Sequence, residues 1–349
     1  MHCRSGLGAA ALAVCFSATG APEVPVSGGS VDGFEPLERV VLMHMRRLGA
    51  PAATVAVGKG DALVYARGFG WADTARTRPV EPDALMRIAS VTKPLTAAAA
   101  RKLIDEGRLD ADDAVLARLA LDETPADRRW TRIRVRHLID HRGGWDAHQS
   151  VDPMFQVDAI ARRLHLERPP RAHDIVRYML REPLQFEPGT RKAYSNFGYC
   201  VLGRVIERVA GTRYIDYLRQ QLLARYGIRD VLLGTMRSAT RDAREVDYPN
   251  GASGFNTVTG DSAAGLVASA PALVRFLEHY WLSGAPRRPG TRGNWAYFGS
   301  LPGTSAMVRQ LRSGVNYAVL MNARREGSHK RDQQRLARRM DAAVERALQ

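Results

Sequence analysis

The stretch Ser90-Val91-Thr92-Lys93-Pro94 sets a hydroxyl and an amine three residues apart at the predicted start of a helix. A serine hydroxyl is a weak nucleophile unless a neighbouring base removes its proton. Residues three apart lie on the same face of a helix, so the Lys93 amine can reach the Ser90 hydroxyl. Proline is tolerated in the first turn of a helix, which supports this start. The stretch therefore predicts Ser90 as a nucleophile and Lys93 as its base.

A second polar triplet, Tyr194-Ser195-Asn196, follows about a hundred residues later. A tyrosine hydroxyl near a lysine can pass a proton to a leaving group, and an asparagine amide can hold the lysine or a substrate carbonyl. The same spacing recurs at Tyr248-Pro249-Asn250, in a turn-like, glycine-rich stretch that needs no chemistry. We therefore predict Tyr194 as the catalytic tyrosine and Asn196 as a substrate-binding residue.

A third element lies near the C-terminus, in the stretch Tyr297-Phe298-Gly299-Ser300. A glycine on an edge strand lets a substrate approach the backbone, whose N–H can complete an oxyanion hole. The alternative interpretation is an ordinary β-turn at Pro302-Gly303, which directly follows. Tyr297, Gly299 and Ser300 are predicted to bind substrate.

The remaining chain arranges its strands at both ends and its helices in the middle. Apolar spacing predicts helices at 34–48, 93–106, 175–180, 197–209, 215–223, 270–282 and 330–347, and strands at 52–57, 62–68, 295–300, 305–311 and 316–322. We expect an α+β fold, with one antiparallel sheet built from N- and C-terminal strands and flanked by helices. Residues 34–95 and 262–349 would form this sheet-and-helix domain, and 96–261 an inserted, mainly helical subdomain.

The composition is that of an ordinary globular chain with a strong positive charge. The 349 residues carry a formal net charge of +15, and 46 of the 51 basic residues are arginines scattered along the chain. Scattered arginines favour a solvated surface over a nucleic-acid site, so we predict no nucleic-acid partner. Nucleic-acid binding is kept as an alternative hypothesis, which a measurement of DNA affinity at different salt concentrations tests. Loose attraction to an anionic cell envelope is a consequence that the charge allows.

Residues 1–21 have the layout of a secretory signal peptide, with Arg4, an apolar stretch and small residues. A linker is expected at 22–33. We predict a periplasmic or secreted protein and rank it above a lipid-anchored form, because Leu12-Ala13-Val14-Cys15 fits a lipoprotein box poorly. Cleavage would leave Cys200 as the single cysteine, so export requires no disulfide.

Two histidines and a tryptophan could also take part in chemistry, but each has a simpler structural interpretation. His137 and His141 are four residues apart, but no third ligand is evident, and we predict no metal and no cofactor. Trp145 follows two glycines and is a candidate substrate contact, with an exposed loop aromatic as the alternative. Neither a Gly-x-Ser-x-Gly elbow nor a Gly-x-Gly-x-x-Gly nucleotide loop occurs in the sequence.

In order and spacing, the elements at Ser90, Tyr194 and Gly299 resemble the serine β-lactamase and penicillin-binding-protein superfamily. The nearest resemblance is to class C β-lactamase-related serine hydrolases, which include esterases and D-aminopeptidase-like enzymes. It extends over roughly 34–322, supported by the stretches 86–89, 133–144, 186–190 and 194–199.

The resemblance implies a role for each matching residue. Ser90 would be the acylated nucleophile, Lys93 and Tyr194 would share the proton transfers, and Asn196 would position the substrate. The N–H groups of Ser90 and Ser300 would form the oxyanion hole. These roles imply an exported serine hydrolase acting on ester, amide or peptide bonds of a small or cell-envelope substrate.

The chain departs from the family pattern in its third element. Relatives place Lys or His at the head of this strand, where Tyr297 and Phe298 stand here. A cation there helps to bind a substrate carboxylate, so its loss disfavours efficient β-lactam or carboxypeptidase turnover; Lys192 or a nearby arginine is a candidate replacement. The alternative function is a β-lactamase-fold binding protein without turnover.

Overall fold

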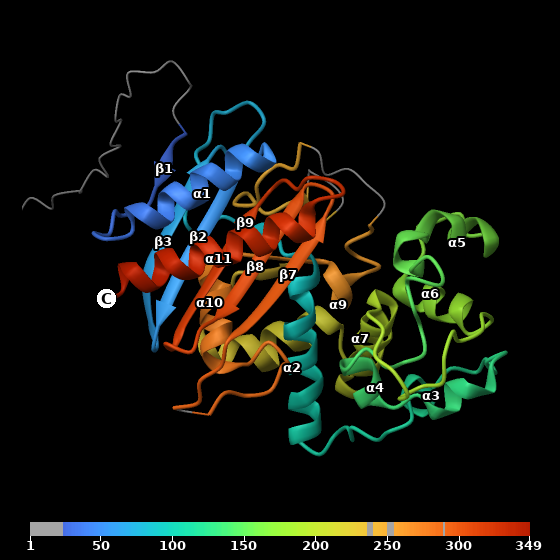
Figure 1. The fold of residues 1–349 in the computed structure, drawn as a ribbon. Helices are drawn as coiled ribbons and strands as arrows, with labels where there is room; N and C mark the ends of the chain where they lie inside the picture. The colour runs from blue at the N-terminus through green and yellow to red at the C-terminus, as the bar shows by residue number, and fades with distance from the viewer. Residues whose placement is uncertain (1–23, 236–239, 250–254, 289) are drawn as a thin grey trace, which may run out of the picture.

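Strands from the two ends of the chain meet in one six-stranded sheet, as the sequence predicted (Figure 1). Its order is β1 (Val26–Ser27), β3 (Ala62–Gly70), β2 (Ala52–Lys59), β9 (Val315–Met321), β8 (Thr304–Gln310) and β7 (Trp295–Leu301). Every neighbouring pair is antiparallel. The N- and C-terminal halves join where β2 pairs with β9, from Ala53 opposite Met321 to Lys59 opposite Val315.

The computed structural model describes residues 24–235, 240–249, 255–288 and 290–349. The predicted signal peptide lies outside these described residues, whereas β1 falls inside the stretch expected to be a linker. Within the described ranges, no helix is both long and apolar enough to cross a lipid bilayer.

Helices cover both faces of the sheet and divide its core into two clusters. On one face lie α1 (Glu35–Leu48) and the C-terminal α11 (His329–Ala347), which pack side by side (Figure 1). On the other face lie α2 (Thr92–Asp105) and α10 (Ala270–His279). Successive side chains of a strand point to opposite faces, so Val55 packs under α1 and α11 while Ala56 belongs to the cluster with α2.

The middle of the chain forms a mostly helical half beside the sheet (Figure 1). Its helices are α3 (Val115–Leu119), α4 (Val135–Ile139), α5 (Val157–Arg163), α6 (Ala172–Met179), α7 (Asn196–Ala210) and α8 (Tyr214–Tyr217), and α9 (Asp261–Ala264) follows nearer the sheet. The helix expected at 215–223 begins as α8 and continues with π-helical hydrogen bonding over Leu218–Leu223.

A small second sheet was not predicted from the sequence. It has the order β4 (Met86–Arg87), β6 (Leu266–Ala268) and β5 (Val231–Leu233). Strands of two or three residues are too short to show an alternating pattern, so only their tertiary pairing reveals them. The sheet matters for function because β4 leads directly into the turn that carries Ser90.

Candidate active site

Ser90 lies in a single 3-10 turn, Ala89–Val91, immediately before α2. This agrees with the predicted position at the start of a helix. Ala89 has a φ of 47°, a left-handed conformation that residues other than glycine rarely adopt. Such backbone strain persists where the surrounding structure holds it, often at functional sites. The turn presents the Ser90 hydroxyl beside the N-terminal end of α2, where free N–H groups favour negative charge.

Lys93 is completely buried, and its amine is held by oxygen atoms from two other parts of the chain. Nζ donates to Asn196 Oδ1 at 2.7 Å and to the Ala263 carbonyl oxygen at 2.8 Å. The same nitrogen lies 3.4 Å from Ser90 Oγ. No carboxylate of the described residues forms an ion pair with Lys93. Its two fixed acceptors aim this amine at the serine.

Tyr194 completes the contact around the serine hydroxyl. Its phenol donates to Ser90 Oγ at 2.7 Å and lies 3.4 Å from Asn196 Oδ1. Lys93 Nζ is 4.8 Å from the centre of the tyrosine ring. The structure therefore brings together Ser90, Lys93, Tyr194 and Asn196, which the sequence had singled out. Tyr248, the competing tyrosine, instead accepts a hydrogen bond from Arg87 N at 2.7 Å and donates one to Glu245 at 3.0 Å.

His141 holds the segment around Tyr194 on both sides. Its carbonyl accepts from Ala193 N at 2.8 Å, and its Nδ1 accepts from Ser195 N at 3.2 Å. The imidazole and phenol ring centres are 4.6 Å apart. Burial, reinforced by the positive charge of Lys93, lowers the pKa of His141 to about 3. The ring is therefore neutral at physiological pH and acts as a hydrogen-bond acceptor.

In the sequence, the four-residue spacing of His137 and His141 suggested only a metal site for His141. The structure gives the Nδ1 atoms of the two histidines different partners: His137 Nδ1 accepts from Arg134 N at 3.2 Å. Among the described residues no group of three metal-ligating side chains occurs. His141 has a φ of 58°, and this left-handed conformation, which sequence spacing cannot reveal, turns its side chain and carbonyl toward the same segment.

His141 is expected to act by positioning Tyr194. We predict that His141→Gly lowers kcat about tenfold, the effect of losing one hydrogen bond, and leaves KM within threefold. His141→Asn retains a side-chain acceptor and should recover most of kcat, and both Gly and Asn tolerate the left-handed backbone. Steady-state kinetics of the two variants check this; equal activity of the two would contradict a positioning role.

Asp152 is a second residue that the sequence analysis did not select. Its buried carboxylate accepts from Asn196 N at 2.9 Å and from Met154 N at 3.0 Å. Burial raises the pKa of Asp152, while these backbone hydrogen bonds and the Lys93 charge oppose the rise. The contact anchors the loop 146–152 to the first residue of α7 and so fixes the amide that holds Lys93.

The edge strand β7 forms the other wall of the site. Gly299 faces the turn at Ser90, and a Cβ atom there would collide with the Ile88 carbonyl oxygen. A two-residue turn joins Leu301 to Thr304, and this pair is hydrogen-bonded across the hairpin. Hydrogen-bonded and non-hydrogen-bonded pairs alternate along an antiparallel ladder, so Ser300 forms no backbone hydrogen bond with β8. Its N–H points instead to the open edge of the sheet, because β7 is the edge strand. Gly299 thus allows the close approach that the predicted oxyanion hole needs.

Tyr297 shares the inward face of β7 with Gly299, and Phe298 packs on the opposite side. Burial raises the pKa of the Tyr297 phenol well above its usual value, so the group stays neutral. A cation does contact this strand, from the other face: Arg324 Nη1 donates to Ser300 Oγ at 3.3 Å and its Nε pairs with Glu326 at 2.8 Å.

Trp145 lies in the core below the site. Its side chain is 4% exposed and packs edge-on against Trp130 and Phe197, with ring centres 5.1 and 4.8 Å away. The sequence suggested that Trp145 contacts the substrate or lies exposed on a loop. Its buried position fits neither of these two interpretations. The glycine pair before it permits a tight turn, which buries the indole.

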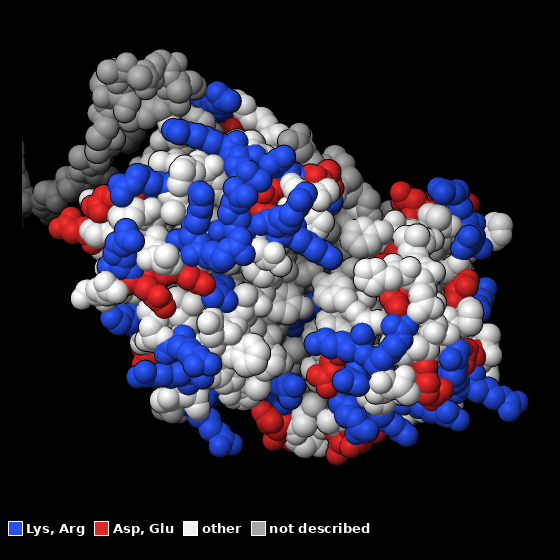
Figure 2. All heavy atoms as spheres, in the orientation of Figure 1, with Lys and Arg blue, Asp and Glu red and all other residues white. Residues whose placement is uncertain are grey.

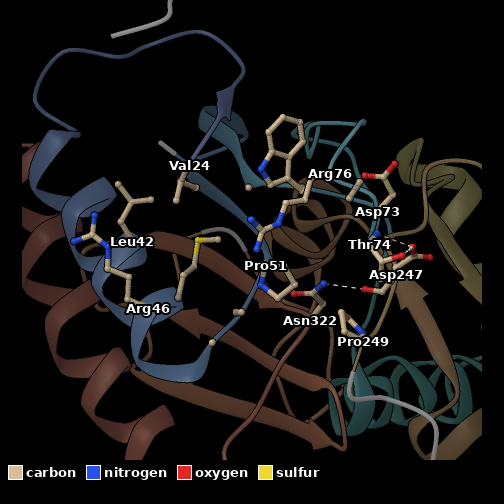
Figure 3. Close-up of a pocket in the computed structure, with 16 residues that line it drawn as sticks. Val24, Leu42, Arg46, Pro51, Asp73, Thr74, Arg76, Asp247, Pro249 and Asn322 are labelled. Atoms are coloured by element: carbon tan, nitrogen blue, oxygen red, sulfur yellow. Dashed lines mark hydrogen bonds between the residues drawn. The ribbon is translucent and has the colours of Figure 1, made fainter. Parts of the chain in front are cut away.

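The cavity drawn in Figure 3 does not mark this site. A cavity of about 490 Å³ lies instead between the end of α1 and the neighbouring ends of β2 and β3, and contains none of the candidate catalytic residues (Figure 3). Figure 2 shows a hollow between the sheet half and the helical half, where the visible surface is mostly uncharged. The site is therefore recognised by its contacts and by its backbone geometry.

An antiparallel sheet beside a helical half, with Ser-x-x-Lys at the start of α2 and Tyr-x-Asn at the start of α7, defines the serine β-lactamase and penicillin-binding-protein class. The chain matches the family model described as Beta-lactamase over residues 37–341 and belongs to that family.

Similar proteins differ in the chemistry their names describe. The mouse mitochondrial serine beta-lactamase-like protein LACTB is 25% identical over 260 residues, covering 57% of this chain and 47% of that protein. The D-amino acid amidase of Ochrobactrum anthropi SV3 has a TM-score of 0.69 at 21% identity, covering 91% and 100% of the two chains. The hydrolase EstCE1 has a TM-score of 0.67 at 19% identity, covering 88% and 98%. The chain spans less than half the length of the curated relatives it matches.

Proposed function

We propose that this chain is a serine hydrolase that forms an acyl-enzyme at Ser90 on small ester, amide or peptide substrates. The observation that carries the proposal is the pair of contacts at Ser90 Oγ, with the Tyr194 phenol at 2.7 Å and Lys93 Nζ at 3.4 Å. A nucleophile within reach of a base that is itself oriented by a third group is the arrangement that activates a serine.

In the proposed reaction, each residue of the site has a separate role. Lys93 takes part as the neutral amine, whose two N–H groups face Asn196 and Ala263 and whose lone pair is left for the serine. Ser90 Oγ forms a bond to the substrate carbonyl carbon as its proton passes to this lone pair on Lys93 Nζ. The carbonyl oxygen takes up the electron pair and faces the N–H groups of Ser90 and Ser300. Tyr194 then protonates the departing alcohol or amine and recovers a proton from Lys93. Water afterwards cleaves the acyl–serine ester by the same proton route in reverse.

The substrate we favour is a small ester or amide over a β-lactam. The neutral, partly buried Tyr297 stands where the family pattern has a cation, so a substrate carboxylate gains no charged partner from this residue on the inward face of β7. Solved structures of similar fold include a D-amino acid amidase and the hydrolase EstCE1. We further propose a periplasmic or secreted location, based on the pattern of residues 1–21, with loose attraction to an anionic envelope.

The second candidate is a binding protein of the same fold that does not turn its ligand over. The same Tyr297 favours it, because the substitution removes a charge that relatives use to bind substrate. The two candidates differ at Lys93: ester hydrolysis that disappears in Lys93→Ala excludes the binding protein, whereas ligand binding unaffected by that change supports it.

Covalent labelling tests the proposal directly. We expect intact-mass analysis after treatment with a fluorophosphonate to show one adduct on the wild type and none on Ser90→Ala. A screen of short acyl esters, a chromogenic cephalosporin and D-amino-acid peptides would then define the substrate class, with turnover of the esters or amides expected. An unlabelled wild type, or an adduct that persists without Ser90, would rule out the acyl-enzyme.

A further inference from the structure

Arginines from α1 and α11, two helices at opposite ends of the chain, gather on one face of the molecule (Figure 2). We call this the α1–α11 face. Its basic residues that form no ion pair with any described residue are Arg39, Arg46, Lys330, Arg331, Arg335, Arg338, Arg339 and Arg346. Elsewhere many arginines pair with carboxylates, as Arg204 does with Asp261 at 2.6 Å. The positive charge of this face is therefore largely uncompensated.

A cavity of about 260 Å³ lies in the groove between the two helices. Arg335 and Arg339 line it from α11, one helical turn apart, and Arg47 lines it from α1. Like charges four residues apart on a helix repel each other, so the arrangement costs stability unless an anion compensates it. Arg47 donates its Nε to Asp332 at 2.6 Å, and its two terminal nitrogens form no hydrogen bond with a described residue.

His44 also lines this cavity. Its side chain is 5% exposed, and its Nε2 has no hydrogen-bond partner in the described part of the chain. A buried polar atom without a partner is rare and calls for an explanation such as an absent ion or water. Burial lowers the pKa of His44 to about 4, so the imidazole is neutral. This unpartnered nitrogen is an observation, independent of the arginines, that points to a ligand in the cavity.

We infer that the cavity between α1 and α11 binds a phosphate-type oxyanion, held by Arg47, Arg335 and Arg339. Guanidinium groups bind such anions through paired N–H donors, and three arginines lining one cavity suit a compact, negatively charged phosphate group. The anion could be free phosphate or the headgroup of a phospholipid, which share this chemistry. The cavity lies across the sheet from Ser90, so the inference does not rest on the proposed hydrolase function.

Two double variants of α11 test the inference with equal loss of charge. Arg335→Gln/Arg339→Gln removes two cavity arginines, and Arg338→Gln/Arg346→Gln removes two unpaired arginines that do not line the cavity. Inorganic phosphate is titrated calorimetrically into the full-length protein and both variants. In a second arm, the three proteins are sedimented with phosphatidylglycerol or phosphatidylcholine vesicles. Thermal unfolding confirms that all three are folded.

We expect the cavity variant to weaken binding at least tenfold and the control variant to weaken it less than threefold. Binding of inorganic phosphate with this pattern identifies a free anion as sufficient. The same pattern seen only with phosphatidylglycerol vesicles identifies the lipid headgroup. Equal losses in the two variants, unchanged binding in the cavity variant, or no binding of either probe would overturn the site.

Discussion

Lys93→Met is expected to lower the rate of Ser90 acylation about 10²–10⁴-fold, the range for removal of a general base. Methionine has a similar length and is apolar, so it fits the fully buried position while removing the amine that lies 3.4 Å from Ser90 Oγ. The acceptors on Asn196 and Ala263 lose their donor, which should also lower the free energy of unfolding by about 1–3 kcal/mol for each acceptor left unpaired.

The control for this change is Lys102→Met on the same helix. Lys102 lies near the C-terminal end of α2 and pairs with Glu106, outside the site. Its replacement makes the same Lys-to-Met change and should leave acylation within twofold. The rate of adduct formation with an activated ester, followed by mass spectrometry, measures both variants. Acylation of Lys93→Met at near wild-type rate would show that another group takes the serine proton.

Gly299→Ala is expected to reduce kcat about 10²–10³-fold, the effect of losing one oxyanion-hole donor. The added Cβ would collide with the Ile88 carbonyl oxygen, which belongs to the backbone and cannot swing away as a side chain could. Strand β7 must then move from the turn that carries Ser90, and the Ser300 N–H leaves the position that a developing oxyanion would occupy.

Gly29→Ala is the matched control for adding one methyl group. Nothing lies within 4 Å of its added Cβ, and its backbone is not left-handed, so activity and stability should change little. Steady-state kinetics and thermal unfolding of both variants are the measurements. A folded Gly299→Ala variant with wild-type kcat would mean that β7 does not supply the oxyanion donor.

The distribution of positive charge shows what the order of residues along the chain leaves out. Along the chain the arginines look evenly scattered, which favoured a diffuse solvated surface. Folding brings α1, near the N-terminus, against α11, at the C-terminus, and thereby places their arginines on one face. The basic residues of α11 are close together in the sequence, but only the fold shows that those of α1, nearly three hundred residues earlier, lie beside them.

Where contacts are local, the sequence determined the structure on its own. Helical spacing placed Lys93 beside Ser90, and alternation and turns placed β7, β8 and β9 in one meander, because both depend on neighbours a few residues apart. The antiparallel sheet from both chain ends also followed from the order of the elements. Only the tertiary structure decided that β2 would pair with β9 at the centre of that sheet.

The parts of the site that the sequence did not reveal all depend on long-range or backbone contacts. His141 acts through its carbonyl and ring on a segment more than fifty residues away, and Asp152 reaches Asn196 from another loop. The Ala263 carbonyl that holds Lys93 belongs to a residue whose side chain carries no chemical signal. The residue types determined which chemistry was available to this protein. The tertiary structure decided which of these groups meet, because the free energy of packing depends on contacts throughout the fold.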